Sequence, residues 1–365
     1  MNSLEEWIKS FKKIDNEIYS HIELYFIGEG VGESTIIHIP GKWVGVVDAF
    51  GTVNGSVTKA ILDLLNINTI NFVFLSHYHY DHFSGLGYIL NNVAIEKYAQ
   101  PSFAKSDDLY KLLVALDCPQ NTSLWKNTPA GNLVYYLHNN LQKLGQNYYE
   151  GNNSTHYLSH DIKSDDNASK TKLNIQGLAP FPHILQNFIK RLPKRLKENP
   201  LRSNNKDDAD INLTSLVLKI TYGKNVIILT GDSENKALNC INLESIFNEP
   251  GLNSLVLKVP HHGSKTSIAD LFFKQELTSL FNKKIAVVTP NRPHKLPEDD
   301  VLEHYLRAGY DLYQTETTFK ETTGDGILET LKSPAGKCPS SIVRVILSHN
   351  GKTSVDFFGK ANQII

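Results

Sequence analysis

Short apolar strands that end in histidine or aspartate constrain the fold of this chain more than any other feature. The apolar run at residues 72–75 leads directly into Ser76-His77-Tyr78-His79-Tyr80-Asp81-His82. Three further apolar runs end in the same residue types, at Asp48, at Asp232 and at the pair His261-His262. Because binding sites in layered α/β folds collect at the carboxyl ends of strands, these segments can converge on one site.

The segment at residues 76–82 predicts a metal site. Three imidazoles and one carboxylate fall within six positions, and these groups are the usual ligands of zinc and related divalent ions. A loop after a strand can turn the pair His77 and His79 one way and the pair Asp81 and His82 another, which suits two adjacent ions. The alternative is a surface cluster of histidines without a metal, and such dense spacing rarely arises by chance.

The remaining chain indicates alternating strands and helices. Apolar spacing predicts strands at residues 21–27, 35–39 and 43–47 and a helix at 57–65, and strands resume from residue 213 onward. Between residues 100 and 210 the pattern changes to two helical faces, a polar stretch at 149–170 that predicts a mobile loop, and a helix at 184–197 that Pro193 should kink. We therefore expect one domain over residues 1–365, with helical and flexible insertions at 100–210.

The composition narrows the classes of protein to consider. The 365 residues carry 37 basic and 38 acidic side chains, so nucleic-acid binding would need a local patch. Three cysteines without close spacing argue against a disulfide framework and a thiolate zinc site, and they fit a reducing compartment. No apolar run approaches the ~18 residues that cross a bilayer, and the N-terminal apolar residues have helical spacing rather than that of a signal peptide. We expect a cytoplasmic protein that does not span a membrane.

The order of these residues along the chain resembles that of the metallo-β-lactamase superfamily. The order is Asp48, then His77-x-His79-x-Asp81-His82, then Asp232, then His261-His262. Within this superfamily, the chain is similar to the soluble hydrolase domain of ComEC-type competence proteins and their stand-alone relatives. The matching segments are residues 28–34, 47–51, 75–86, 212–218, 229–232, 257–264 and 291–294. The resemblance implies a four-layer αββα sandwich of the α/β class, with two divalent metal ions, zinc or manganese, at the edge between its sheets.

The resemblance also implies roles for individual residues. The expected ligands are His77 and His79 for one ion, Asp81, His82 and His262 for the other, and Asp232 as the bridge. Asp81 and His261 are expected to take part in catalysis, His261 as an acid or a substrate contact. Asp48 would orient the histidine loop, or would be a simple turn residue. Many members of the superfamily have a further histidine where this chain has residues 213–216, so its first ion is expected to be held more weakly.

The substrate is less constrained than the metal site. The chain offers cationic, amide and hydroxyl donors that suit a phosphate oxygen and would suit a carboxylate equally well. These predicted substrate contacts are Ser264, Lys265, Asn291, Arg292 and His294. The basic residues between 190 and 197 are either a solvated helix face or a patch that follows a nucleic-acid backbone. We expect a dinuclear hydrolase of phosphodiesters, of the nuclease type of its relatives, in which a hydroxide bridging the two ions attacks phosphorus.

Two alternatives stay open at the level of the sequence. The chain could hydrolyse a small phosphodiester, a lactone or a β-lactam. It could also be a catalytically silent module that binds nucleic acid or protein and keeps the metals for structure. The presence of both Asp81 and Asp232 argues against the silent module, since loss of either would remove a ligand.

Overall fold

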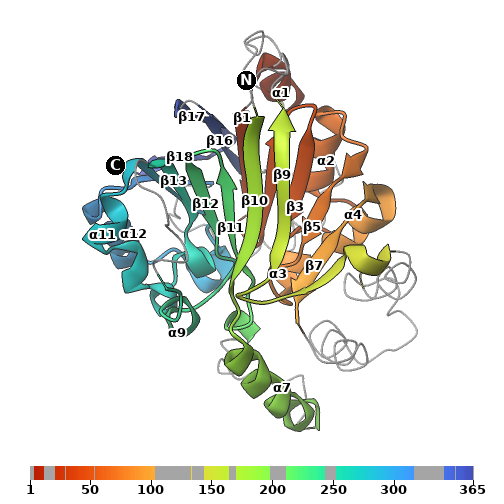
Figure 1. Cartoon of the computed structure of the whole chain (residues 1–365), viewed down its shortest axis with the longest axis vertical. Coiled ribbons are helices and arrows are strands. Elements are labelled where there is room, and N and C mark those ends of the chain that lie inside the picture. The colour runs from red at the N-terminus through yellow and green to blue at the C-terminus, as the bar shows by residue number, and fades with distance from the viewer. Residues whose placement is uncertain are drawn as a thin grey trace.

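The fold is built on two eight-stranded sheets that face each other (Figure 1). The computed structural model describes residues 4–11, 21–28, 30–52, 54–102, 133, 144–163, 170–197, 211–242, 252–315, 341–349 and 351–364. The first sheet has the order β17-β16-β1-β2-β3-β5-β7-β8, and the second has the order β18-β15-β14-β13-β12-β11-β10-β9. A two-stranded sheet pairs β4 (Thr69–Ile70) with β6 (Ala94–Ile95).

The strands of the two large sheets have the following bounds. The first sheet contains β1 (His21–Gly28), β2 (Glu33–Ile39), β3 (Trp43–Val47), β5 (Phe72–Phe74), β7 (Tyr98–Pro101), β8 (Tyr148–Gly151), β16 (Ser341–Ser348) and β17 (Thr353–Phe358). The second contains β9 (His156–Lys163), β10 (Lys170–Ala179), β11 (Val217–Tyr222), β12 (Asn225–Leu229), β13 (Leu252–Lys258), β14 (Phe281–Val288), β15 (Asp311–Gln314) and β18 (Asn362–Ile364).

Helices cover the outer faces of both sheets (Figure 1). The α-helices are α1 (Leu4–Phe11), α2 (Val57–Leu64), α3 (Tyr80–Phe83), α4 (Leu86–Asn92), α7 (Pro182–Lys197), α9 (Asn235–Leu238), α11 (Gln275–Thr278) and α12 (Asp299–Arg307). Short 3-10 segments occupy Gly145–Asn147, Pro260–Gly263, Lys265–Ser267, Asp270–Phe272 and Arg292–His294. None of the described helices is long and apolar enough to cross a membrane.

Three apolar cores divide the molecule into four layers. Phe26 of the first sheet and Leu218 of the second belong to the central core between the sheets. Ile61 of α2 belongs to the core on the outer face of the first sheet, and Tyr305 of α12 belongs to the core outside the second sheet. Each sheet therefore buries both faces over much of its width, and the four-layer αββα sandwich expected from the sequence is confirmed.

Parallel strands in both sheets aim their carboxyl ends at one edge of the sandwich. In the first sheet β3 is parallel to β5, and in the second β12, β13 and β14 are parallel. The segments singled out in the sequence follow β3, β5, β12 and β13 directly. The topology thus brings together polar segments that are far apart in the chain, as the strand-end pattern predicts.

The structure corrects one expectation for residues 100–210. Residues 149–163, which were expected to belong to a loop, are mostly strand: β8 lies at the edge of the first sheet, and β9 pairs with β10 at the edge of the second. An edge strand with one face toward solvent needs few apolar residues, and β9 buries only Tyr157 and Ile162. The helix expected at 184–197 begins at Pro182 and continues through Pro193. The helices expected near residues 109–116 and 133–144 fall almost wholly outside the described residues.

Candidate metal centre

The first half of the centre is the loop that follows β5. His77 and His79 lie before α3 in extended backbone, two residues apart, and His77 Nε2 is 3.1 Å from His79 Nδ1. Helix α3 then begins at Tyr80, which places Asp81 and His82 in its single turn. The change from extended chain to helix separates the two pairs of side chains, as the spacing predicts.

Asp48 fixes this loop from behind. It follows β3 with a positive φ of 57°, which is uncommon outside glycine and marks a constrained position. Its carboxylate accepts hydrogen bonds from the backbone N–H and the hydroxyl of Ser76, both at 2.6 Å, and lies 2.8 Å from His82 Nδ1. This contact leaves His82 Nε2 to face the centre, because a ligating imidazole uses its other nitrogen for a supporting hydrogen bond.

The second half of the centre comes from the second sheet. Asp232 follows β12 after Gly231, whose φ of 51° allows the sharp turn. His261, His262 and Gly263 follow β13 with φ values of 46°, 53° and 84°. Three consecutive left-handed residues are costly, and such backbone is found where a site requires it.

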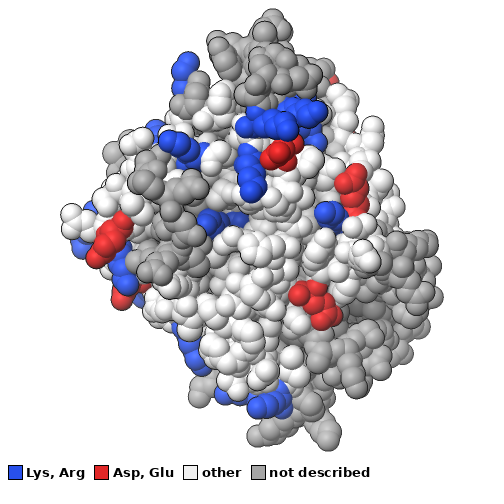
Figure 2. Space-filling view, viewed as in Figure 1, with Lys and Arg blue, Asp and Glu red and all other residues white. Residues whose placement is uncertain are grey.

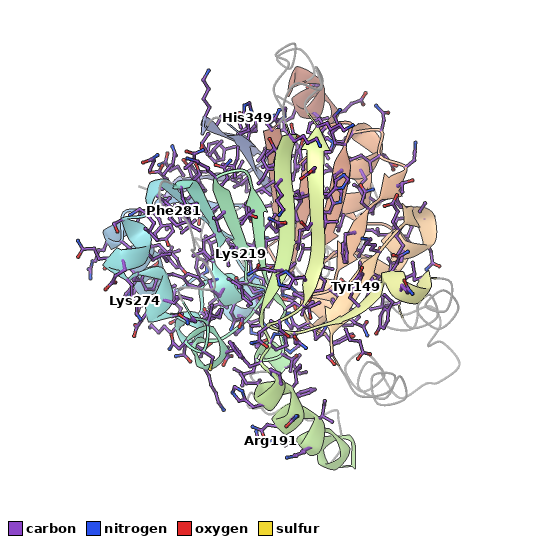
Figure 3. All side chains as sticks on the ribbon, in the orientation of Figure 1. Tyr149, Arg191, Lys219, Lys274, Phe281 and His349 are labelled. Carbon is purple, nitrogen blue, oxygen red and sulfur yellow. The ribbon has the colours of Figure 1, made fainter. Side chains whose placement is uncertain are left out.

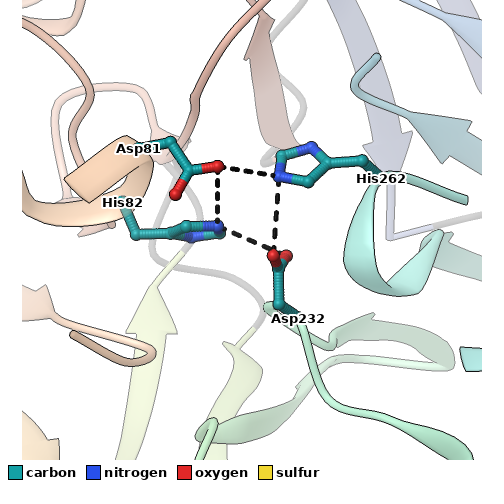
Figure 4. A group of neighbouring side chains, drawn as sticks. All are labelled: Asp81, His82, Asp232 and His262. Carbon is teal, nitrogen blue, oxygen red and sulfur yellow. Dashed lines mark hydrogen bonds and ion pairs between the residues drawn. The ribbon is translucent and has the colours of Figure 1, made fainter. Parts of the chain in front are cut away.

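The turn aims His262 at the carboxylates. Its Nδ1 donates to the carbonyl oxygen of Thr289 at 2.7 Å, so Nε2 is left to face Asp81 Oδ2 at 3.2 Å and Asp232 Oδ2 at 3.5 Å. Figure 4 shows Asp81 and His82 meeting Asp232 and His262 across the gap between the two halves. His262 is therefore held as a ligand would be, with one nitrogen anchored and the other free to coordinate.

Two groups of side chains have the geometry of a metal site, and they share one residue. In each group, one ligand atom from every member lies within 4.8 Å of those of the other members. The first group consists of Asp81, His82, Asp232 and His262, and the second consists of His77, His79 and Asp232. The structure thus brings together all six residues predicted as ligands, with Asp232 common to both groups. A shared carboxylate is the arrangement expected of a bridge between two ions.

Divalent cations fit this donor set. Imidazole nitrogens and carboxylate oxygens suit zinc and manganese. His82 Nε2 and Asp232 Oδ1 are buried 3.3 Å apart, and neither atom has a hydrogen-bond partner among the described residues. Because a buried polar atom is costly without a partner, these two atoms are poised for a cation between them.

Burial and neighbouring charges shift the pKa values of the predicted ligands. Burial lowers the pKa of His82, but the carboxylates of Asp232, Asp81 and Asp48 outweigh burial and raise it well above the usual range. Burial raises the pKa of Asp81, and the charges of His82 and His262 outweigh it, leaving a pKa of about 2. Burial together with neighbouring imidazoles lowers the pKa of His77. Such strongly perturbed groups are typical of functional sites.

A second layer of polar residues under the ligands was not identified from the sequence. Glu33 at the start of β2 and Lys258 at the end of β13 form a buried ion pair with Nζ 2.6 Å from Oε2. The Thr289 hydroxyl donates to the same Glu33 carboxylate. The available signal was Lys258 itself, since a lysine inside the apolar run 255–259 is unusual in a buried strand.

His261 lies at the more open side of the centre. It keeps 22% of its side-chain surface exposed and has Asn212 Nδ2 at 3.3 Å from Nε2 and Thr266 Oγ1 at 3.3 Å from Nδ1. Burial lowers its pKa to about 4 despite the opposing charge of Asp232. A neutral imidazole at the mouth of the site can contact a substrate. Asn212 is a further neighbour that the sequence prediction left without a role.

Three of the five predicted substrate contacts are engaged elsewhere. Asn291 is buried and donates to Asp81 Oδ2 at 3.0 Å, so it orients a ligand. The Lys265 ammonium pairs with Glu298 at 2.8 Å and with Asp300 at 3.3 Å. Ser264 caps the following 3-10 turn. These three side chains have partners within the protein, and their role as substrate contacts stays a prediction.

The other two predicted substrate contacts lie on the loop after β14. The Arg292 backbone N–H donates to the carbonyl oxygen of Gly30 at 2.8 Å, which ties this loop to the glycine turn before β2. His294 is exposed and ends the 3-10 segment that Arg292 begins. Both residues keep the accessibility that a substrate contact requires, and their role stays a prediction.

Comparisons with known proteins agree with this geometry. A model of the metallo-beta-lactamase superfamily matches residues 27–106, which include the loop after β5. Recombination protein 2 of Haemophilus influenzae is 35% identical over 98 residues, a match that covers 26% of this chain and 11% of that protein. The chain therefore matches only about a tenth of the length of this curated relative.

Similar solved structures share low sequence identity with the chain. The metallo-beta-lactamase fold protein YhfI from Bacillus subtilis is 11% identical, with 81% of this chain and 98% of that chain covered and a TM-score of 0.38. A diphosphatase from the PhnP family is 10% identical, with 93% and 99% covered and a TM-score of 0.34. Residues 27–106 of this chain therefore match the metallo-beta-lactamase superfamily.

Proposed function

We propose that this protein is a dinuclear metal-dependent hydrolase of phosphodiesters, with nucleic acid as its substrate. The observation that carries the proposal is the pair of ligand groups that share Asp232. Two divalent ions bound there would supply Lewis acidity and activate a water molecule at neutral pH. The identity of the ions, zinc or manganese, is part of the proposal and is tested below.

The chain's own residues would orient the ligands and contact the substrate. Asp48 and Thr289 hold the imidazoles of His82 and His262, and Asn291 holds Asp81. The lowered pKa of His261, about 4, leaves the partly exposed imidazole neutral near pH 7, so it can form a hydrogen bond with a substrate but lacks the proton that a general acid donates. The predicted role of His261 as a substrate contact is therefore favoured over its role as an acid.

A nucleic-acid substrate is supported by the partial match to Recombination protein 2, because recombination is a process of nucleic acids. It is also supported by the position of α7. Ile184 of α7 packs with Leu213 and Ala237, which are neighbours of Asn212 and Asp232 in the chain. Helix α7 thus begins beside the metal centre and extends away from the sandwich (Figure 1).

The exposed side of α7 is basic. Lys190 and Arg191 are exposed, and Figure 3 places Arg191 on the part of α7 that projects from the body of the molecule. Figure 2 shows lysine and arginine side chains at the same end. A cationic helix that leads away from the centre suits a polyanion longer than the reacting phosphodiester.

The decisive experiment is a hydrolysis panel with metal-depleted protein and added zinc or manganese. Single- and double-stranded DNA, RNA, cyclic nucleotides and the β-lactam nitrocefin are the substrates. We expect metal-dependent cleavage of DNA or RNA. Cleavage restricted to cyclic nucleotides or nitrocefin would replace this proposal with a small-molecule hydrolase, and inactivity on every substrate would favour the silent binding module.

The contribution of α7 is tested by salt dependence. Neutralising Lys190, Arg191 and Lys194 should reduce the slope of DNA affinity against salt by up to about 2–3 units, since each phosphate contact releases condensed counterions. The matched control neutralises Lys163, Lys170 and Lys172, which lie about 30 Å away at the opposite end of β10 from α7. An unchanged slope in the α7 variant, or an equal change in the control, would remove α7 from the proposed interface.

A further inference from the structure

One cluster of ligand-type side chains beneath the centre already contains a cation of the protein. Glu33, Asp48 and His82 bring ligand atoms within 4.8 Å of one another, and the Lys258 ammonium pairs with the Glu33 member of this cluster. Its Nζ lies 2.6 Å from Glu33 Oε2, 3.2 Å from the carbonyl oxygen of Gly231 and 3.8 Å from Asp232 Oδ1. Lysine 258 is 2% exposed, so its charge is screened by protein groups rather than by water.

The pair joins the two halves of the centre. Glu33 lies in the first sheet and Lys258 in the second, while the hydroxyl of Thr289, which follows β14, donates to Glu33. Glu33 Oε2 is also 3.5 Å from His262 Nδ1, and Oε1 is 3.8 Å from His82 Nδ1. Glu33 is therefore fixed from several sides, and its position determines where the ammonium of Lys258 sits.

The ammonium and the metal ions compete for the same carboxylate. Asp232 is the residue common to both metal groups, and Lys258 approaches its Oδ1 to 3.8 Å without reaching hydrogen-bond distance. A lysine side chain has four rotatable bonds, so a shift of about 1 Å would bring the ammonium into contact with Asp232. Without Glu33, Asp232 is the nearest carboxylate to Lys258 in the described part of the chain.

We propose that Glu33 is a positioning residue of the metal centre, which holds the Lys258 ammonium away from Asp232 so that the shared carboxylate stays available to two ions. The inference rests on the dinuclear centre of the proposed function. It assigns to Glu33 an effect on metal loading that does not require Glu33 to touch a metal. It also predicts that the effect disappears when Lys258 is removed.

The test measures Mn²⁺ binding to metal-depleted protein by calorimetric titration, together with the electron paramagnetic resonance signal of coupled Mn²⁺ pairs. Glu33→Gln keeps the shape of the side chain and removes its charge. We expect its Mn²⁺ affinity to fall about 10- to 100-fold and its coupled signal to weaken, as for other residues that support a metal ligand. The double variant Glu33→Gln/Lys258→Met has no buried ammonium to compete, so affinity and coupled signal should largely return.

Two further variants complete the experiment. Glu298→Gln removes the carboxylate partner of the exposed Lys265 and serves as a matched control, with unchanged Mn²⁺ binding expected. Thr289→Val removes the hydroxyl that donates to Glu33 and leaves both charges, so it tests the inference even if Glu33→Gln does not fold. Its affinity should fall about five-fold, the size expected for one net hydrogen bond, and Lys258→Met should restore it.

The outcomes separate this inference from the proposed function. Wild-type affinity in both Glu33→Gln and Thr289→Val would overturn the inference, and so would a double variant as weak as its Glu33→Gln parent. Failure of the wild-type protein to bind a second ion would instead overturn the dinuclear function. Urea unfolding of the same variants separates competition from a structural loss, because removing an unpaired buried ammonium can also restore stability. Rescue of Mn²⁺ affinity by Lys258→Met supports competition when Glu33→Gln is as stable as the wild type, and it overturns competition when affinity and stability fall and recover together.

Discussion

Glu23 and Asp232 are both buried carboxylates surrounded by histidines, yet their environments differ. Glu23 accepts hydrogen bonds from Arg344 and from the Tyr25 hydroxyl at 2.7 Å, and it lies 2.8 Å from His38 Nδ1 and 3.1 Å from His21 Nε2. Asp232 has no charged partner nearer than His82 at 3.3 Å among the described residues. The first carboxylate is paired with a guanidinium at hydrogen-bond distance, whereas the second has imidazoles as its nearest cationic partners.

Around Asp232 the carboxylates outnumber the permanently charged cations. The carboxylates of Asp48, Asp81 and Glu33 lie close to the same imidazoles, and Lys258 is the nearby ammonium. Burying charges without compensation costs several kcal/mol per ion, so a stable fold either pairs them or binds a cation. The comparison indicates that surplus acid, rather than histidine content, distinguishes a candidate metal site from a structural ion cluster.

The largest expected effect separates the shared ligand from an unshared one. Asp232→Ala removes a carboxylate from both metal groups, so both binding events should be lost and hydrolysis should fall by more than about 1,000-fold. Asp81→Ala affects only one group and should keep one binding event. Metal titration and circular dichroism of the folded variants check this, and two retained ions in Asp232→Ala would contradict the bridging role.

The next largest effect should be on stability, at the balanced cluster formed by Glu23, Arg344, His21 and His38. Arg344→Met leaves Glu23 buried without its guanidinium, which should lower the free energy of unfolding by about 3–5 kcal/mol. Metal content should not change, because Arg344 pairs with Glu23 and Asp356, which lie outside the centre. Urea unfolding and elemental analysis of the same preparation check both statements. A change in metal content would break the distinction between the clusters.

A smaller effect is expected behind the ligands. Asp48→Asn keeps the size of the side chain and weakens its hold on His82 Nδ1 and Ser76, so metal affinity should fall about 10- to 100-fold. The fold should persist, because the substitution preserves the shape of the side chain. Competition with a fluorescent chelator measures the affinity. Unchanged affinity would reduce Asp48 to a turn residue, the alternative that the sequence left open.

The smallest effect is a pH dependence at the balanced cluster. Burial raises the pKa of Glu23, but hydrogen bonds from His21 and His38 and the charge of Arg344 outweigh it and hold the pKa well below its usual value. Because the folded pKa is depressed, this stability is present above the unfolded pKa of about 4.3 and is lost as the pH falls toward the folded value. Urea unfolding from pH 6 to pH 3 should show a shallower loss for Glu23→Gln than for the wild type. Parallel losses would show that other carboxylates dominate the acid limb.

The strand ends and the ligand residues could be predicted from the sequence. An apolar run of strand length that stops at histidine or aspartate predicts two things at once. It predicts a buried strand, and it predicts a polar side chain at the edge of the sheet where that strand ends. The prediction failed at residues 149–163, because an edge strand with one face in solvent needs few apolar residues and resembles a loop. The sequence also did not reveal the protein partners of Lys265 and Asn291, because spacing along the chain does not show which side chains meet in the fold.

The sequence alone determined which side chains can bind metal, because ligand chemistry is a property of residue type and the strand-end pattern places it. Only the tertiary structure decided how those side chains are shared and supported. Asp232 belongs to two groups because β12 ends opposite the loop after β5, and Glu33 meets Lys258 because two sheets pack face to face. Glu33 and Lys258 are 225 positions apart in the chain, so their contact depends on the packing of the sheets and not on local sequence.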